Sequence, residues 1–318
     1  MALSFIRRGK FACVALARRM LSWFRRLLNI KMNKIIAFDH RLINLCPIRL
    51  RVEACHRHSL VLSMSECPPE FSDRKRRLVV WLHPARGLVP FGLRCDSLES
   101  FKLLPKTIGV TARLYQNQFV FEHGATFELT GAGVSLRVLP SDDALSNGLA
   151  RARQAFIQRQ ISNDSPHPEP LASALQKRLD TLISRLCSGD FETNGGLLRP
   201  LIGLGLGSTP SGDDMIAGVL AALWTIHSAH ALAARSAISQ EIHGICPSQT
   251  TKTSRDMLWH AANGYFPEAL GNVAKGLRDQ NCDSEEFRRR VENLFSVGAT
   301  SGRDMGMGIL KMALKFIF

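Results

Sequence analysis

The segment GLGLGSTPSGDDMIAG, residues 203–218, carries the strongest structural signal in the chain. Three glycines alternate with leucines, and Thr209-Pro210-Ser211-Gly212 then leads through Asp213-Asp214 into an apolar helix. Glycine permits positive φ and lets backbone N–H groups approach a ligand closely. Ser211 or Thr209 is expected to cap the helix, whose N-terminus then offers N–H donors to an anion.

A second segment of the same form is expected to begin another helix. SGRDMGMG at residues 301–308 and SGDDMIAG at 211–218 both fit S-G-x-D-M-x-x-G, and each has a threonine close before it. The two segments lie ninety positions apart, which indicates a pseudo-repeat or a site with two anion-binding loops. The alternative is that both segments are helix caps that serve stability only. Such caps would not need to share a methionine and a glycine, so the shared residues favour a site.

These loops do not match the common nucleotide-binding signatures. A dinucleotide site would need a strand–loop–helix–strand unit with an acidic residue downstream, and none is visible in the sequence. A P-loop would need the lysine of G-K-[ST], which is missing. The loops therefore predict an anion site of another kind.

Between the two helix starts lies TTKTS, residues 250–254. Its hydroxyls and lysine offer contacts to phosphate or carboxylate, and the alternative is an ordinary capping segment. His260, shortly after it, is interpreted as a packing residue. Two histidine pairs lack a third ligand at an obvious spacing, which disfavours metal binding; these are His56 with His58 and His227 with His230.

Charge and the pattern of apolar residues divide the chain into three parts and predict an α+β fold. Residues 1–34 form a basic tail, 35–145 a β-rich unit (a small barrel or an open meander), and 146–318 an all-helical unit carrying the two glycine-rich helix-capping loops. Strands are expected at Ser59–Ser63, Leu78–Leu82, Gln118–Phe121 and Val134–Leu139. Helices are expected at Leu171–Cys187, Met215–Ala234, Ser254–Ala262, Ala269–Leu277, Glu285–Phe295 and Ile309–Phe318.

Charge is concentrated in the tail. The 318 residues carry a formal net charge of +14, of which residues 1–34, with nine basic and no acidic side chains, supply +9. The rest is only mildly basic, which argues against a nucleic-acid-binding protein. As a helix the tail would be amphipathic, able to contact an anionic membrane through residues 1–31 or to resemble a transit peptide. The alternatives are a solvated appendage or an upstream start codon, with Met20 or Met32 as the true start.

Two further observations favour a globular protein of the cytoplasm. The eight cysteines contain no C-x-x-C pair, and scattered thiols suit a reducing compartment better than a disulfide scaffold. Met215–Ala234 is a twenty-residue stretch without formal charge, long enough to span a membrane. Its Gly, Ser, Thr and His residues and the two acids before it indicate a buried helix instead.

Three segments in this order, GLGLGSTPSGDDMIAG, TTKTSRDMLWHAANGYFPEAL and VGATSGRDMGMGIL, closely resemble the AllH family. The resemblance covers about residues 195–312 and only loosely the β-rich half. Within the glycine loop the family usually has proline and leucine where this chain has Leu206 and Ser208. The basic tail is not a family feature either.

The resemblance implies a subunit of oxamate carbamoyltransferase that acts with FdrA-like and AllG-like subunits. That enzyme interconverts oxalurate plus phosphate with oxamate plus carbamoyl phosphate during allantoin breakdown. The ligand would then be a small anion, namely carbamoyl phosphate, oxamate or oxalurate. No cofactor is implied with certainty, although Mg²⁺ fits the acids.

The developing charge of carbamoyl transfer needs fixed donors, and these residues supply them in a working hypothesis. Asp213, Asp214 and Asp304 would be catalytic, with Asp214 and Asp304 orienting the amine or anchoring Mg²⁺. Arg303 would neutralise an oxyanion, beside backbone N–H groups around 207–212 and 300–302. The expected substrate-binding set is Gly205, Gly207, Thr209, Ser211, Gly212, Thr250, Thr251, Ser254, Thr300, Ser301, Gly302 and Arg303.

Three functional interpretations remain open on the sequence. The chain is a carbamoyltransferase subunit, a non-catalytic anion-binding scaffold subunit, or a membrane- or nucleic-acid-associated protein that depends on its tail. Deleting residues 1–31 separates the third from the others, because only the third predicts loss of function.

Overall fold

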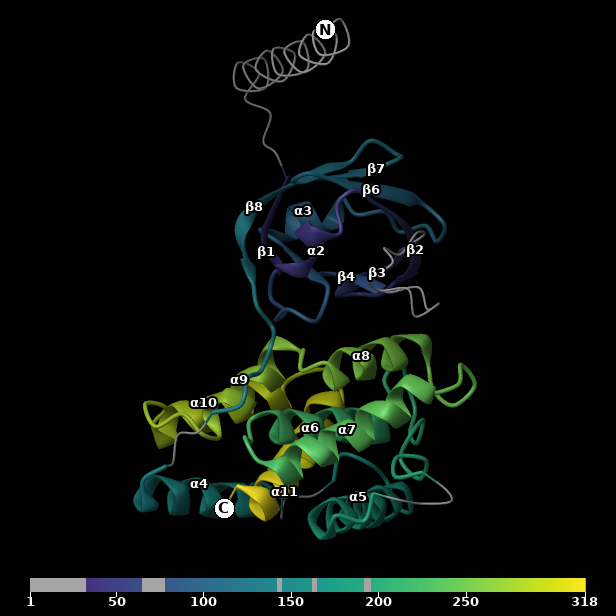
Figure 1. Ribbon diagram of the computed structural model, residues 1–318. Coiled ribbons are helices and arrows are strands. Elements are labelled where there is room, and N and C mark those ends of the chain that lie inside the picture. The colour runs from purple at the N-terminus through teal and green to yellow at the C-terminus, as the bar shows by residue number, and fades with distance from the viewer. Residues whose placement is uncertain (1–32, 65–77, 142–144, 162–164, 192–195, 318) are drawn as a thin grey trace, which may run out of the picture.

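The computed structural model describes residues 33–64, 78–141, 145–161, 165–191 and 196–317. A β-barrel forms the N-terminal half and a cluster of helices the C-terminal half (Figure 1). The α+β class expected from the sequence is confirmed, and the N-terminal unit is a barrel, one of the two predicted forms. Among the described residues, no helix has the length and apolarity that a membrane crossing requires.

The barrel is closed, with strands in the order β1-β5-β4-β3-β2-β6-β7-β8. β1 pairs with β8, and β4 with β5, in parallel; the other neighbours are antiparallel. Closure leaves no free sheet edge. The strands are β1 (Asn33–Asp39), β2 (Ile48–Cys55), β3 (Ser59–Met64), β4 (Leu78–Leu82), β5 (Gly92–Cys95), β6 (Thr111–Tyr115), β7 (Gln118–Phe121) and β8 (Thr126–Val134), with short helices α2 (Arg41–Asn44) and α3 (Leu98–Lys102) between them.

Trp81 fills the interior of the barrel. It is fully buried, and its ring meets those of Phe119 and Phe127 edge to face at centroid distances of 4.6 and 4.7 Å. Its indole N–H donates to the Cys95 Sγ at 2.9 Å, so that its polar atom is satisfied. This aromatic cluster, with the inward side chains of the alternating strands, forms the barrel core.

Three predicted strands are confirmed as β3, β4 and β7, but Val134–Leu139 is not a strand. β8 ends at Val134, and the backbone that follows bonds to the helical half instead: the Val138 N–H donates to the Gly264 carbonyl at 2.9 Å. The Leu136 carbonyl accepts from the Phe266 N–H at 3.1 Å. The apolar alternation of this segment therefore reflects its burial between the two halves.

The helical half contains α4 to α11, with α8 and α9 nearest the barrel and α4 and α5 farthest from it (Figure 1). Five of the six predicted helices correspond to α5, α8, α9, α10 and α11 within a few residues. α11 begins at Ser301, where the second S-G-x-D-M-x-x-G segment predicted a helix start, eight residues before the apolar stretch Ile309–Phe318. The helices are α4 (Asn147–Ile161), α5 (Leu171–Ser188), α6 (Ser211–Trp224), α7 (Ala229–Gly244), α8 (Lys252–Ala262), α9 (Glu268–Gly276), α10 (Ser284–Phe295) and α11 (Ser301–Phe316).

The prediction of one helix over Met215–Ala234 is wrong, because two helices share this stretch. α6 ends at Trp224, and α7 begins after Ser228, whose hydroxyl accepts the Ala231 N–H at 3.1 Å. Ile226, in the break, bridges to Ser141 of the segment leaving the barrel. The expected buried helix is confirmed for α6, in which every residue except Trp224 is buried.

α6 and α11 pack against each other through the glycines of the two S-G-x-D-M-x-x-G segments. A Cβ on Gly218 would lie 2.1 Å from the Met305 carbonyl oxygen, and one on Gly308 would lie 2.1 Å from that of Met215. Each glycine therefore admits the backbone of the other helix. The pseudo-repeat of the sequence thus corresponds to a reciprocal helix crossing.

A buried polar network joins the two halves. The Arg41 guanidinium lies 3.6 Å from the ring centroid of Tyr265 and 4.4 Å from that of Phe91. Its Nε donates to both oxygens of buried Asp39, at 3.0 and 3.1 Å. Its Nη1 lies 3.4 Å from the Nδ1 of His260, which is fully buried and thus packs as expected. These contacts fix α8 against the barrel.

We expect Gly218→Ala to destabilise the protein by about 1–3 kcal/mol, because the new methyl group would overlap backbone atoms of α11 that cannot move alone. Denaturant unfolding measures the loss. Gly148→Ala is the matched control, since no described atom lies within 4 Å of a Cβ there, and it should leave stability unchanged or raise it by up to about 1 kcal/mol. Equal unfolding midpoints for the two variants would contradict the described crossing.

Candidate functional site

The first turns of α6 and α11 bring Asp214 and Asp304 together, and we call these two side chains the carboxylate pair. Asp214 is 8% exposed and Asp304 1% exposed. The serine of each segment hydrogen-bonds to the aspartate of the other, Ser301 to Asp214 and Ser211 to Asp304. The two similar segments therefore form one site, because the serine of each helix contacts the aspartate of the other.

Burial raises the pKa of Asp214 well above its usual value. Hydrogen bonds from Ser301 and Thr209 oppose the shift, and the nearby charges of Asp304 and Asp213 add to it. The Thr209 hydroxyl also lies 3.1 Å from that of Ser301, which links the glycine loop to α11. Asp214 therefore holds a proton more tightly than an exposed aspartate does.

The pKa of Asp304 is also raised by burial. His167 opposes this shift most strongly, because its Nε2 lies 2.7 Å from the Asp304 Oδ1. Ser211 and Thr300 bond to the same carboxyl group. His167 comes from the segment before α5, so a third part of the chain reaches the site.

The second oxygen of each carboxylate lacks a hydrogen-bond partner. Both Oδ2 atoms, of Asp214 and of Asp304, are buried and unpartnered in the described chain. An unsatisfied buried acceptor costs free energy, and such exceptions concentrate at functional sites. Two free acceptors at two helix N-termini suit an N–H donor of a ligand or a cation.

Asp213 has a different role from its neighbour. Its Oδ1 accepts the Gly203 N–H at 2.9 Å, and its Oδ2 accepts the hydroxyls of Thr250 and Ser254, the latter at 2.6 Å. Burial raises its pKa despite these bonds. In this arrangement Asp213 holds the glycine loop against the start of α8, and its acceptors are already occupied.

The hydroxyl groups of the TTKTS segment also form hydrogen bonds within the chain. Thr251 caps α8 by accepting the Ser254 N–H at 3.0 Å, and its hydroxyl donates to the Ser208 carbonyl at 2.5 Å. With Thr250 and Ser254 bound to Asp213, three of the hydroxyls expected to bind substrate support the glycine loop instead. For Thr251 the alternative interpretation of TTKTS, an ordinary helix-capping segment, is therefore the correct one.

The glycine loop is shaped by two close approaches. A Cβ on Gly203 would lie 2.1 Å from the Gln249 carbonyl oxygen, and one on Gly205 would lie 2.8 Å from the Ser211 nitrogen; both residues have positive φ. At the tip, nothing lies within 4 Å of a Cβ on Gly207, and Leu206 is 90% exposed. Among the described residues, none accepts a hydrogen bond from the backbone N–H groups of 205–209.

The expected side-chain caps are absent at both helix starts. Pro210 is the N-cap of α6 and Thr300 that of α11, and neither side chain makes a cap bond. The serine and threonine hydroxyls bond to the carboxylate pair instead. The Gly212 and Gly302 N–H groups donate to the carbonyls of Leu204 and Val297, each at 2.9 Å, so these two amides are occupied.

Arg303 lies at the position in α11 that Asp213 holds in α6. Its side chain is exposed, with the guanidinium 5.8 Å from the Phe295 ring centroid. No group of three or more His, Cys, Asp or Glu side chains in the described chain is arranged to hold a metal ion.

His167 is the site residue that sequence reasoning missed. It lies in the polar, proline-rich segment SPHPEP, residues 165–170, which precedes α5. Its side chain is only 8% exposed in the structure. The one available signal was a histidine between two prolines, and nothing local indicates that it meets a residue 137 positions away.

Residues 201–313 match the family model described as oxamate carbamoyltransferase subunit AllH. The match spans about a third of the chain and contains the glycine loop, α8 and both aspartates of the carboxylate pair. The resemblance drawn from the three sequence segments is confirmed over this part. Neither the curated proteins nor the solved structures contain a match to the chain.

We expect Asp214→Asn to gain stability relative to the unchanged protein as pH rises. A carboxyl whose folded-state pKa is raised contributes its stability below the unfolded value, and that contribution is lost as pH climbs through the folded value. Asparagine cannot ionise and escapes the loss. Melting temperatures of both proteins from about pH 4 to about pH 8 measure the difference. A difference that stays constant over this range would show that Asp214 ionises normally.

Asp213→Asn should lower the free energy of unfolding by about 1–3 kcal/mol, because the new NH₂ group would face a donor such as the Gly203 N–H. Chemical denaturation gives the value. Asp190→Asn is the control, since the Asp190 side chain is 55% exposed. If the two variants unfold alike, Asp213 does not hold the loop.

Proposed function

We propose that this chain is a subunit of an oxamate carbamoyltransferase, in which the carboxylate pair handles the proton of the transferred group's nitrogen. The observation that carries the proposal is the pair of buried aspartates with unpartnered Oδ2 atoms, inside the segment that matches the AllH family. The partners would be FdrA-like and AllG-like subunits, and the setting cytoplasmic allantoin breakdown.

Carbamoyl transfer requires the oxamate nitrogen to gain a proton in one direction and to lose one in the other. A phosphate oxygen attacks the carbamoyl carbon of oxalurate, the bond from that carbon to the oxamate nitrogen breaks, and the nitrogen takes up a proton as oxamate leaves. In reverse the oxamate nitrogen attacks carbamoyl phosphate and gives up a proton. A carboxyl with a raised pKa is suited to both directions, and Asp214 has such a pKa.

The anionic end of the substrate has donors nearby. Gly205 and Gly207 have positive φ, and backbone N–H groups in such a loop are suited to binding anions. Thr209 joins this loop to the carboxylate pair through its bonds to Asp214 and Ser301. Gly205, Gly207 and Thr209 would therefore bind oxyanions, beside the N-termini of α6 and α11.

The other expected residues divide into two groups in this proposal. Ser211, Ser301 and Thr300 would tune the carboxylate pair, whereas Asp213, Thr250, Thr251 and Ser254 would hold the loop in place. Gly212 and Gly302 would permit the close packing of the helix starts, and exposed Arg303 would reach an oxyanion only if it turns inward. Mg²⁺ can bind two carboxylates and complete its shell with water and substrate phosphate.

The test is thermal unfolding of the full chain with carbamoyl phosphate, oxamate, oxalurate or phosphate, each with and without Mg²⁺. A ligand at a hundred times its dissociation constant stabilises by about 2.7 kcal/mol. We expect a shift with oxalurate or carbamoyl phosphate that Asp214→Asn and Asp304→Asn remove and that Asp190→Asn retains.

Turnover separates the catalytic role from an anion-binding scaffold. With FdrA-like and AllG-like subunits added, each variant of the carboxylate pair should lose most of the activity. Ligand binding combined with unchanged turnover in Asp214→Asn and Asp304→Asn would assign the chain to the scaffold role. Absence of any ligand shift, with the partners present, would contradict the proposal.

A further inference from the structure

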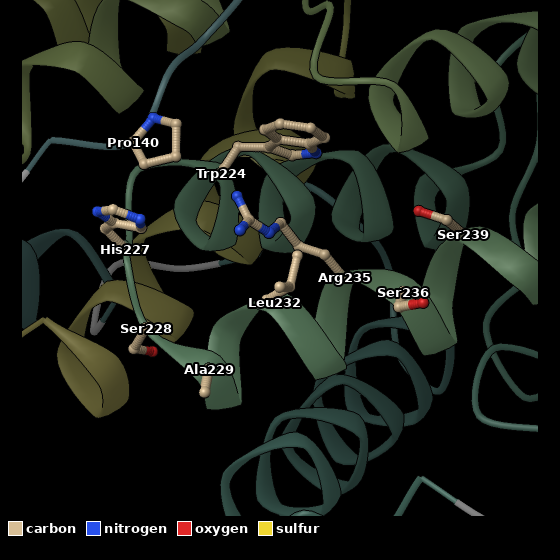
Figure 2. Close-up of a pocket in the computed structure, with 9 residues that line it drawn as sticks. All are labelled: Pro140, Trp224, His227, Ser228, Ala229, Leu232, Arg235, Ser236 and Ser239. Atoms are coloured by element: carbon tan, nitrogen blue, oxygen red, sulfur yellow. The ribbon is translucent and has the colours of Figure 1, made fainter.

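A pocket of about 580 Å³ lies where α6 ends and α7 begins (Figure 2). It is at the opposite end of α6 from the carboxylate pair; a 14-residue helix is about 20 Å long. We call it the Arg235 pocket. Its lining residues are Pro140, Trp224, His227, Ser228, Ala229, Leu232, Arg235, Ser236 and Ser239.

Arg235 is a buried cation in this pocket with free donors. The residue is 7% exposed, and its Nε and Nη1 have no hydrogen-bond partner among the described residues. No ion pair of Arg235 with a described residue is present, and no aspartate or glutamate lines the pocket. Because a guanidinium stays protonated in proteins, this is an uncompensated buried charge.

Trp224 adds a second donor and a flat wall. The Arg235 Cζ lies 4.7 Å from the centroid of the Trp224 ring, and the indole Nε1 is also buried, with no partner in the described part of the chain. Two other polar groups are occupied, since the Ser228 hydroxyl caps α7 and the Ser239 hydroxyl donates to the Ala262 carbonyl at 3.2 Å. Arg235 and Trp224 thus both bring unused donors to the pocket.

The remaining walls are mainly apolar. Pro140 closes one side, and Leu232, which is 60% exposed, forms part of the rim. Figure 2 shows the Arg235 guanidinium beneath Trp224 and facing the space beside Pro140 and His227. One cation in such surroundings fits a single negative charge on an apolar body better than a highly charged phosphate.

We propose that the Arg235 pocket binds a small organic carboxylate, with its oxygens on the guanidinium of Arg235 and its apolar body against Trp224 and Leu232. Guanidinium and carboxylate match in geometry and charge. The pocket has the volume of a small-molecule site. This ligand is separate from the substrate proposed for the carboxylate pair.

Calorimetric titration of the full chain with benzoate tests the proposal, and benzamide serves as the neutral probe of the same shape. We expect saturable one-to-one binding of benzoate and none of benzamide. Arg235→Met removes the donors and keeps the apolar stem, so it should weaken benzoate binding at least about tenfold. Arg151→Met, the same change at an exposed position on α4, should leave it unchanged.

A second pair of variants leaves Arg235 in place. Leu232→Glu puts a carboxylate three residues before Arg235 on the same helix face, where the two can pair. It should weaken benzoate binding at least about tenfold, whereas Leu232→Gln should retain it. Absence of saturable benzoate binding, equal binding of benzamide, or binding that survives both Arg235→Met and Leu232→Glu would overturn the proposal.

Discussion

The backbone contact between α6 and α11 is the constraint on which the rest of the helical half depends. Gly218 and Gly308 each leave room for a carbonyl of the other helix, where any side chain would overlap it. Because the contact is reciprocal, the first turns of both helices meet, and the serine of each reaches the aspartate of the other. The crossing thus creates the site and the core together.

Bringing two carboxylates into this core has a free-energy cost that the helices only partly offset. The N-terminal ends of α6 and α11 favour negative charge, and hydrogen bonds from neighbouring hydroxyl groups oppose the rise in the pKa of both carboxyl groups. The unpartnered Oδ2 atoms show that the compensation is incomplete. Asp213, one residue away, is fully used in holding the loop, so adjacent acids have separate physical roles.

The two ends of α6 differ in the charge they bury. Its start holds acids with raised pKa values, and its end packs Trp224 against the unpaired cation of Arg235. Between them the helix is buried on every face, so it cannot shift without repacking α11 and α8. The segment leaving the barrel crosses beside the far end, where Ser141 bridges to Ile226.

Local patterns were sufficient for much of the secondary structure. Short apolar runs rich in β-branched and aromatic residues, SLVLS and LVVWL, predicted strands, and helical spacing predicted α5 and α8 to α10, because the physical cause lies within a few neighbouring residues. The failures at Val134–Leu139 and Met215–Ala234 have a shared cause. In both places a contact with a distant segment replaced the local preference for a strand or a helix. Residues 134–139 bond to Gly264 and Phe266, and Ile226, between α6 and α7, bridges to Ser141.

The sequence by itself determined the α+β division, the two like helix starts and the aspartates that they carry. Only the tertiary structure decided that these starts interlock, that Asp213 is a structural residue, and that His167 and Arg235 have unusual surroundings. The reason is physical: residue type and spacing fix what a backbone can locally adopt. Burial and hydrogen-bond partners arise from segments more than a hundred residues apart, as His167 and Asp304 are.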